Sequence, residues 1–298
     1  MNIGWNGSII RQEEAVISVY DHGFLYGMGL FETFRTYGGK PYLLQRHLDR
    51  LAEGCAALGI RGGSELSADK LTAWLHQLME ANQLTDAYVR LTVTAGEDIL
   101  GLPSGDYEKP NMLLMVKSLP APNPSLYQNG RELALLKTVR NTPESEVRLK
   151  SLHYMNNIIA KRELAGSGAA AGAEGLMLTK EGYLAEGIVS NLFFVRGGHL
   201  YTPAIETGIL PGITRGRVLE LARESAADTG IAAAKVEEGL YTWVELMEAD
   251  EVFITNSIQE LVPVTSLRDL AGDCRTIGNG QAGPITTKLL DAYQKDTR

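Results

Sequence analysis

The 298-residue sequence lacks the features that define disulfide-rich, membrane-spanning and nucleic-acid-binding proteins. It has two cysteines, Cys55 and Cys274, which are too few for a disulfide framework or a cysteine-based zinc site. No stretch approaches the roughly 20 consecutive apolar residues that a membrane helix needs. Lys and Arg together number 28 against 36 Asp and Glu, and the resulting charge of −8 argues against a sequence-independent nucleic-acid binder. The first ten residues do not resemble a signal peptide, so we expect a soluble, cytoplasmic protein without nucleic-acid or membrane partners.

Several common catalytic patterns are also missing. The five histidines show no metal-ligand spacing on a shared helix face, and no GxSxG nucleophile turn occurs. The segment "GSGAAAG" at 166–172 contains several glycines, but it follows a helical pattern, whereas a dinucleotide-binding loop follows a strand. The sequence therefore predicts no metal site and gives little support to a hydrolase, a metalloenzyme or a dinucleotide-dependent enzyme.

The periodicity of apolar residues predicts a mixed α/β fold with two domains. With 44% apolar and 21% charged residues, the composition is that of ordinary globular proteins. The proline-rich segment "PAPNPSLYQNG" indicates a linker at 119–130, between a smaller α+β domain at 1–118 and a larger domain at 131–298. In the second domain we expect strands at 132–139, 174–179, 183–185, 191–196 and 251–255, and helices at 152–166, 214–228, 242–248 and 284–294.

The first domain shows its elements through turn and capping residues. Asn6-Gly7 between short apolar pieces predicts a hairpin. Ser67 is a good helix cap, and Phe31 and Arg35 share one face of a predicted strand because side chains alternate with a period of two.

The segment "EVRLKSLHYMNNIIAKRELA" raises the question of chemistry. Lys150 stands where an alternating pattern changes to a helical one. Such a lysine is either a solvated surface residue or a buried amine that forms a Schiff base. A nucleophilic amine must be neutral part of the time, and burial beside cations favours the neutral form. The segment alone leaves both interpretations open.

Three further segments contain groups that could bind an anionic, nitrogen-containing cofactor. "ETGILPGITR" places Ile213 and Thr214 at a helix start, where free backbone N–H groups bind phosphate, although a plain helix cap is the simpler interpretation. "ITNSIQELVPV" ends a strand with Asn256-Ser257, which could supply further donors or be only a turn. Glu186 lies between a short strand and an apolar one, where it could pair with a protonated ring nitrogen or be solvated.

The order of these segments resembles the class-IV pyridoxal-phosphate enzymes, which include branched-chain aminotransferases, D-amino-acid aminotransferases and 4-amino-4-deoxychorismate lyases. The lyases are the most similar of the three. The matching segments, from residue 21 to 264, are "DHGFLYGMGLFETFR", "RHLDRL", "VRLKSLHYMNNIIAKRE", "AEGIVSNLFF", "TGILPGITR" and "ITNSIQELVPV". The resemblance implies a fold of the D-amino-acid aminotransferase type (fold type IV), with pyridoxal 5'-phosphate between the two domains and the larger domain binding the cofactor.

The resemblance also assigns roles to individual residues. Lys150 matches the lysine that carries the cofactor and acts as the base, and Glu186 matches the acid at the ring nitrogen. The remaining matches are phosphate ligands, a ring-oxygen neighbour and substrate contacts. The phosphate ligands are Arg50, Ile213, Thr214, Ser257 and Asn256. Tyr154 matches a neighbour of the ring oxygen, and ordinary packing is its alternative role. The residues that line the substrate side are Arg35, Arg90, Tyr88 and Phe31, and strand-face salt bridging is the alternative for the two arginines.

The resemblance implies a homodimer that converts 4-amino-4-deoxychorismate to 4-aminobenzoate and pyruvate in folate synthesis. The alternative is a branched-chain aminotransferase. A D-amino-acid aminotransferase is disfavoured, because the loop "AGEDILGLPSGDY" has none of the basic residues that grip the substrate carboxylate in those enzymes. A catalytically silent relative that acts as a binding protein is a third hypothesis. Arg148, two residues before Lys150, is a further candidate for substrate contact.

Overall fold

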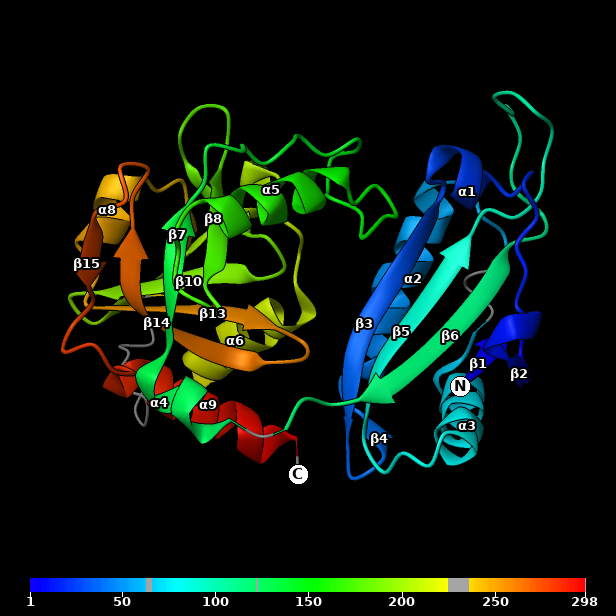
Figure 1. The fold of residues 1–298 in the computed structure, drawn as a ribbon, viewed down its shortest axis with the longest axis horizontal. Coiled ribbons are helices and arrows are strands. Elements are labelled where there is room, and N and C mark those ends of the chain that lie inside the picture. The colour runs from blue at the N-terminus through cyan, green and yellow to red at the C-terminus, as the bar shows by residue number, and fades with distance from the viewer. Residues whose placement is uncertain (63–65, 122, 225–235, 298) are drawn as a thin grey trace. The chain divides into compact units, whose positions relative to one another are not determined.

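The structure, a computed structural model, describes residues 1–62, 66–121, 123–224 and 236–297. The chain forms two compact α/β units (Figure 1). Unit 1 comprises Met1–Ala121 together with Leu149–His153, and unit 2 comprises Pro122–Arg148 and Tyr154–Arg298. The domain limits expected from the sequence placed every residue after 130 in the second domain. Five residues around Lys150 belong instead to unit 1, so the chain leaves unit 2 and returns to it at this point.

Unit 1 contains an antiparallel sheet with the strand order β2-β1-β6-β5-β3-β4. Its first hairpin turns at Asn6 and Gly7, both with positive φ, as the sequence predicts. The strands are β1 (Asn2–Trp5), β2 (Ser8–Arg11), β3 (Gly29–Tyr37), β4 (Lys40–Pro41), β5 (Ala87–Thr94) and β6 (Asn111–Ser118).

Helices of unit 1 cover one face of this sheet, and α2 runs behind β3 and β5 in Figure 1. The helices are η1 (Gln12–Glu14), α1 (His22–Tyr26), α2 (Leu44–Ala57) and α3 (Ala68–Ala81). The Ser67 side chain accepts a hydrogen bond from the Lys70 N–H and caps α3, as predicted. Leu71, Leu75 and Leu78 are completely buried, because their spacing of four and three residues places them on one face of α3.

Unit 2 contains a larger mixed sheet, for which the described residues give the strand order β12-β11-β10-β13-β14-β7-β8-β9, with β15 paired to β14. The sheet curves, so that β9 at one end also contacts β10. The strands are β7 (Arg131–Leu135), β8 (Glu174–Leu178), β9 (Leu184–Gly187), β10 (Asn191–Arg196), β11 (His199–Pro203), β12 (Val236–Gly239), β13 (Glu251–Asn256), β14 (Glu260–Arg268) and β15 (Cys274–Thr276).

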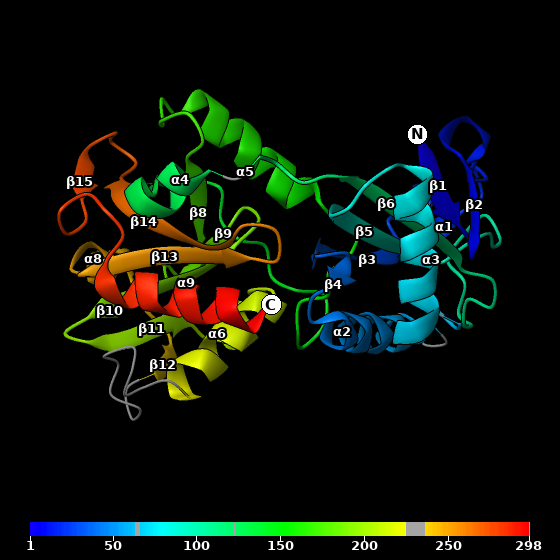
Figure 2. The same cartoon turned by 90° about the horizontal axis from the view of Figure 1, so that it is seen from below.

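Helices pack on both the ends and the faces of this sheet. Figure 2 shows α9 running alongside β13, with α6 beside it. The helices are α4 (Pro124–Asn129), α5 (Met155–Gly166), η3 (Ile205–Thr207), α6 (Ile213–Glu224), α8 (Trp243–Met247) and α9 (Pro284–Asp296). The segment expected to be a linker, 119–130, thus contains a short helix, α4. Of the helix expected at 214–228, residues 225–228 lie outside the described residues.

Two element boundaries that matter for the site differ from the sequence prediction. The strand expected at 132–139 ends at Leu135, because the backbone N–H groups of Lys137 and Thr138 donate to the Glu163 carboxylate at 2.6 and 2.9 Å instead of to a neighbouring strand. The strand expected at 183–185 is β9, Leu184–Gly187, so Glu186 lies inside a strand and not between two strands.

The helix expected at 152–166 begins only at Met155. The preceding residues are extended because they pair with β3 of unit 1. The N–H of Phe31 donates to the carbonyl oxygen of Lys150 at 2.9 Å, and the N–H of Leu152 donates to that of Gly29 at 3.0 Å. Lys150 is therefore held in an added, strand-like segment and not at a direct joint between strand and helix.

Glu251 on β13 provides a test of how the last helix is attached. Its carboxylate accepts hydrogen bonds from the N–H groups of Ile285 and Thr286 at 3.0 and 2.8 Å, at the start of α9. Glu251→Ala should lower the free energy of unfolding by about 2 kcal/mol, because buried donors lose their acceptor. Urea unfolding followed by circular dichroism measures this change. The exposed Glu248→Ala is the control and should change stability by less than about 0.5 kcal/mol; equal effects of the two substitutions would contradict the capping role.

Candidate active site

The residues singled out from the sequence are divided between the two units. Unit 1 holds Phe31, Arg35, Arg50, Tyr88, Arg90 and Lys150, and unit 2 holds Tyr154, Glu186, Ile213, Thr214, Asn256 and Ser257. In unit 1 most of them lie on one face of the sheet, and in unit 2 Thr214 lies beside Ser257.

In unit 1, Lys150 lies against an aromatic ring that a second cation also contacts. The Lys150 Nζ atom is 4.6 Å from the centre of the Phe31 ring, and the Arg90 Cζ atom is 3.6 Å from it. Phe31 is buried, with an exposed fraction of 2%. A cation near the face of an aromatic ring is stabilised by the ring quadrupole. Phe31 therefore fixes the directions of two positive groups on one face of the sheet.

The other predicted substrate contacts extend this face. Arg35 pairs with Tyr88 across strands β3 and β5, which makes Arg35 a diagonal neighbour of Arg90. The Arg35 guanidinium stacks on Tyr37 at 4.4 Å, and the Lys117 amine stacks on Tyr88 at 4.5 Å. The face is thus cationic and aromatic.

The opposite side of β3 carries a buried acid that the sequence analysis missed. Glu32 accepts hydrogen bonds from Arg50 Nε at 2.8 Å, from Arg50 Nη2 at 2.6 Å and from His47 Nδ1 at 2.6 Å. Burial by itself raises the pKa of Glu32, but the Arg50 charge and the His47 hydrogen bond outweigh it and lower the pKa to about 2. Arg50, the predicted phosphate ligand, is therefore already oriented by a carboxylate.

His47 connects this cluster electrostatically to Lys150. Burial lowers the pKa of His47, the Glu32 carboxylate opposes that shift, and the Arg50 and Lys150 charges add to it. At neutral pH the ring is then uncharged and donates its Nδ1–H to Glu32. The motif "RHLDRL" suggested only Arg50, whereas the i, i+3 spacing of His47 and Arg50 on α2 places both on Glu32.

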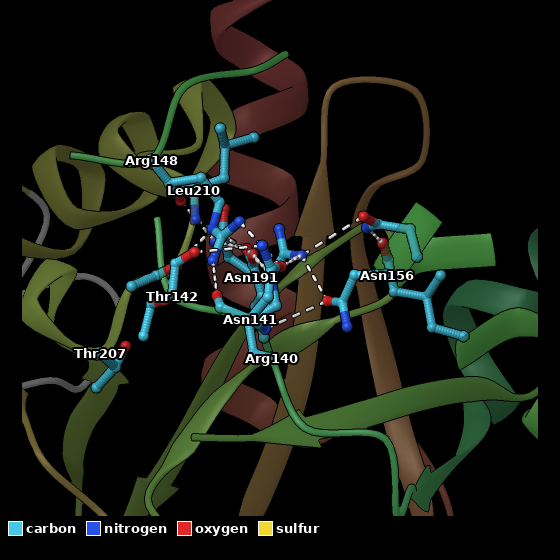
Figure 3. Close-up of polar contacts among 12 residues, drawn as sticks. Arg140, Asn141, Thr142, Arg148, Asn156, Asn191, Thr207 and Leu210 are labelled. Atoms are coloured by element: carbon cyan, nitrogen blue, oxygen red, sulfur yellow. Dashed lines mark hydrogen bonds and ion pairs between the residues drawn. The ribbon is translucent and has the colours of Figure 1, made fainter. Parts of the chain in front are cut away.

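In unit 2, Glu186 is the centre of a second polar cluster (Figure 3). Its Oε1 atom accepts from Arg140 Nε at 2.8 Å, and its Oε2 atom accepts from Asn191 Nδ2 at 3.2 Å and from the Leu210 N–H at 3.1 Å. The side chains of Glu186 and Arg140 are only 6% and 7% exposed. A buried carboxylate needs this compensation, since an unpaired charge in such a place is strongly destabilising.

Arg148 lies in the same cluster, and the structure shows what holds it. Its Nε atom donates to the Gly208 carbonyl oxygen at 2.5 Å, and its Nη2 atom donates to the Asn141 carbonyl oxygen. The distance from Arg148 Nε to Glu186 Oε1 is 4.0 Å. Burial and the neighbouring Arg140 charge lower the pKa of Arg148 to about 10, while Glu186 acts in the opposite direction. Arg148 thus anchors the chain two residues before Lys150 and joins it to the loop before α6.

That loop connects Glu186 to the predicted phosphate site. A Cβ atom at Gly212 would lie 2.0 Å from Asn191 Oδ1, so only glycine allows the loop to approach Asn191 this closely. Helix α6 begins at the next residue, and Thr214 Oγ1 lies 3.3 Å from Ser257 Oγ. The Asn256 side chain accepts from the N–H groups of Ile258 and Gln259 at 3.0 and 2.8 Å, which shapes the turn after β13.

The hydrogen-bond donors of unit 2 fit the phosphate group of a cofactor such as pyridoxal 5'-phosphate. The first N–H groups of a helix have no partner within the helix, and the helix dipole favours an anion there. The hydroxyl groups of Thr214 and Ser257 are beside them. The Thr255 hydroxyl is buried and has no hydrogen-bond partner among the described residues. Glu186, which accepts a hydrogen bond from Leu210 of the same loop, is a carboxylate of the kind that pairs with a protonated ring nitrogen.

Tyr154 precedes the first residue of α5, is half-buried and does not cap the helix with its side chain.

In the described part of the chain, no group of three or more His, Cys, Asp or Glu residues could hold a metal ion. Across the same residues, none of the helices has the length and apolar character needed to cross a membrane.

Comparison with known proteins identifies the family. The family model for amino-transferase class IV matches residues 29–267. The aminodeoxychorismate lyase of Bacillus subtilis is 38% identical over 98% of this chain and 94% of its own length. A putative branched-chain-amino-acid aminotransferase of Methanocaldococcus jannaschii is 37% identical over 100% of this chain and 96% of its own. A T.th. branched-chain amino acid aminotransferase, solved with pyridoxamine 5'-phosphate, superimposes with a TM-score of 0.83 at 28% identity, covering 99% and 93% of the two chains.

The chain belongs to the class IV aminotransferase family. It is a pyridoxal-phosphate-dependent enzyme of fold type IV that acts on a small molecule, and the family and fold expected from the sequence are confirmed. The two curated relatives are nearly equally identical to this chain but differ in activity, so their identities alone do not separate a lyase from an aminotransferase.

The Glu32 cluster predicts a pH-dependent contribution to stability. Glu32→Gln should lower the free energy of unfolding at neutral pH by about 3 kcal/mol, because the Arg50 charge loses its buried partner. The lowered pKa of Glu32 means that this contribution is complete above the ordinary carboxyl pKa of 4.5 and is lost as pH falls toward about 2. Urea unfolding from about pH 6 to about pH 3 should show the difference between the two proteins shrinking. A difference that stays constant, or equals that of the exposed Glu53→Gln on α2, the helix that carries Arg50, would contradict the assignment.

Proposed function

We propose that this chain is a 4-amino-4-deoxychorismate lyase, which forms 4-aminobenzoate and pyruvate in folate synthesis. The observation that carries the proposal is the cationic face of unit 1, where Lys150 and Arg90 pack on Phe31 and Arg35 is the diagonal neighbour of Arg90. The substrate is a cyclic amine with two carboxylates, one on the six-membered ring and one on the enolpyruvyl group. Two guanidinium groups beside an aromatic side chain suit such a molecule, since arginine binds carboxylates through paired hydrogen bonds. The identity of 38% with the Bacillus subtilis lyase supports the same activity.

Pyridoxal 5'-phosphate is the cofactor, as expected from the sequence and confirmed by family membership. When bound, it supplies an aldehyde that accepts an amine and a protonated ring that withdraws electrons from the adjacent carbon. In the proposal, Lys150 would hold the aldehyde carbon, and Glu186 would keep the ring nitrogen protonated. Ile213, Thr214, Asn256, Ser257 and Arg50 would hold the phosphate, and Tyr154 would contact the ring oxygen.

The proposed chemistry needs one base and one leaving group. Lys150, as the base, would remove the proton from the substrate carbon that bears the amine. The neighbouring carbon–oxygen bond then breaks, and the enolpyruvyl group departs with a proton as pyruvate. The six-membered ring becomes aromatic, which makes the reaction strongly downhill. The products contain all the atoms of the substrate, so no water or second substrate is consumed.

The alternative within the same family is a branched-chain aminotransferase. The Methanocaldococcus jannaschii relative, 37% identical, supports it, and Arg35 or Arg90 could also bind the single carboxylate of a branched-chain amino acid. A D-amino-acid aminotransferase is less compatible, because the loop at 95–107 contains no Arg, Lys or His. The lyase is preferred because the substrate with two carboxylates employs both arginines.

We further propose that the protein is a homodimer and that unit 1 contributes an apolar surface to its interface. Segments 16–26 and 97–102 lie together, since His22 Nε2 is 2.8 Å from the Ile99 carbonyl oxygen. Together they expose several large apolar side chains: Val16 at 76%, Val19 at 67%, Phe24 at 70%, Ile99 at 63%, Leu100 at 73% and Leu102 at 87%. Adjacent apolar side chains this exposed are typical of a protein interface.

The oligomeric state can be measured directly. Light scattering should give about twice the chain mass of 32.4 kDa. The pair of substitutions Val19→Asp and Leu102→Asp should shift the protein toward the monomer, because charged side chains are costly to bury at an interface. Leu270→Asp, at an apolar residue of unit 2 that is 52% exposed, is the control and should leave the mass unchanged. A wild-type protein with the mass of one chain would refute the dimer.

The activity is tested by offering two substrates separately. Holoenzyme given 4-amino-4-deoxychorismate should release 4-aminobenzoate and pyruvate, and holoenzyme given leucine and 2-oxoglutarate should form little glutamate. Lys150→Ala should reduce the lyase rate by at least about a thousandfold, since it removes both the cofactor attachment and the base. The exposed Lys180→Ala serves as the control and should retain the wild-type rate. Glutamate formation alone would establish the aminotransferase, and the absence of both activities in the wild-type protein would favour a silent binding protein.

A further inference from the structure

Arg140, which the sequence analysis did not single out, makes the shortest hydrogen bond to Glu186. Its Nε atom donates to Glu186 Oε1 at 2.8 Å, and its Nη1 atom donates to Asn156 Oδ1 at 2.9 Å and to Asn141 Oδ1 at 3.1 Å (Figure 3). The side chain is 7% exposed. A planar guanidinium bound on two sides cannot rotate without breaking several hydrogen bonds, so it holds the carboxylate in one orientation.

The local fold explains why Arg140 reaches this place. The chain bends after β7 because Glu163 on α5 binds the N–H groups of Lys137 and Thr138. The Arg140 N–H then donates to the Leu178 carbonyl oxygen at 2.8 Å, which fixes the backbone at the end of β8. The first residues of α5 supply Asn156 on the other side of the guanidinium.

The donors around Glu186 leave one acceptor position of its carboxylate for a further hydrogen-bond donor. A carboxylate has about four acceptor positions. Arg140, Asn191 and the Leu210 N–H occupy three of them. The remaining position is what a protonated ring nitrogen would use under the proposed function. The neighbouring Arg148 does not replace Arg140, because its Nε atom is 4.0 Å from the carboxylate and donates to Gly208.

We propose that Arg140 is a positioning residue that orients the Glu186 carboxylate toward the cofactor ring. This inference rests on the proposed role of Glu186. Arg140 does not touch substrate or cofactor, so its effect must pass through the carboxylate. Partners of this kind, which orient a ligand-binding group, typically change affinity or activity by about tenfold to a hundredfold when they are removed.

The experiment compares apoprotein variants by their affinity for two probes, pyridoxal 5'-phosphate and inorganic phosphate, measured by equilibrium dialysis. Arg140→Gln should weaken pyridoxal 5'-phosphate binding by about tenfold or more and leave inorganic phosphate binding unchanged, because only the ring contact is affected. Glu186→Gln should act in the same direction. The double variant should bind no more weakly than Glu186→Gln alone, since a residue that acts only through Glu186 has nothing left to act on.

Two further variants separate positioning from general stability. Arg140→Lys keeps the positive charge but loses the planar set of N–H donors, so it should recover part of the pyridoxal 5'-phosphate affinity that Arg140→Gln loses. Arg217→Gln removes an arginine that is ion-paired to Asp296 and Glu220 in the same unit, so it should lower the melting temperature without changing pyridoxal 5'-phosphate affinity. In the loaded enzyme, Arg140→Gln should lower kcat more than it changes KM, because the substrate itself is not contacted.

The possible outcomes distinguish this inference from the proposed function. Wild-type affinity in Arg140→Gln, or additive losses in the double variant, would overturn the positioning role while leaving that of Glu186 intact. Unchanged affinity in Glu186→Gln would overturn both. Coupled losses of affinity in a protein without lyase activity would support Arg140 and refute only the proposed reaction. Should Arg140→Gln not fold, the same coupling is measured with Arg140→Lys, and wild-type affinity in that variant would overturn the inference.

Discussion

The backbone pairing of Leu149–His153 with β3 is the constraint on which the rest of the site depends. The hydrogen bond between the Phe31 N–H and the Lys150 carbonyl oxygen places the lysine beside the ring on which its amine packs. A lysine in a loop would sample many rotamers, and ordering it would cost up to about 2 kcal/mol of side-chain entropy. Here the sheet fixes the backbone and Phe31 restrains the side chain. The chain on either side of this segment, at Arg148 and Tyr154, belongs to unit 2.

Both units solve the problem of buried charge in the same way. Glu32 is held by Arg50 and His47, and Glu186 is held by Arg140, Asn191 and a backbone N–H group. In each case an ion pair between a carboxylate and an arginine holds the group proposed to contact the cofactor, which is Arg50 in unit 1 and Glu186 in unit 2. Buried ion pairs contribute little net stability compared with apolar packing. Their value here is geometric, because they set the direction of groups whose orientation determines the chemistry.

The sequence predicted those features that depend on local pattern. The alternation of β3, the Ser67 cap and the start of α6 all follow from the spacing of neighbouring residues. The motifs also indicated the family, and with it the cofactor. Glu186, which the resemblance assigns to the ring nitrogen, lies buried in β9, a strand that extends further than expected, and its role at the ring stays a prediction.

The features that the sequence could not predict depend on contacts between distant residues. Glu163 ends β7 early by binding backbone groups about 25 positions away, and nothing in the alternating pattern at 132–139 indicates this. Arg140 meets Glu186 only because of that bend. Glu32 has the spacing of an ordinary strand residue, and its partners on α2 become evident only once the helix packs on the sheet. The extended conformation at Lys150 likewise requires β3, which precedes it by more than a hundred residues.

We expect Lys150 to be the one residue that attaches covalently to pyridoxal 5'-phosphate. Reduction of the holoenzyme with borohydride makes that attachment permanent, and peptide mapping by mass spectrometry then identifies the modified residue. The account predicts one pyridoxyl group per chain, on the peptide that contains Lys150. A label on another lysine, or none in a protein that shows activity, would contradict it.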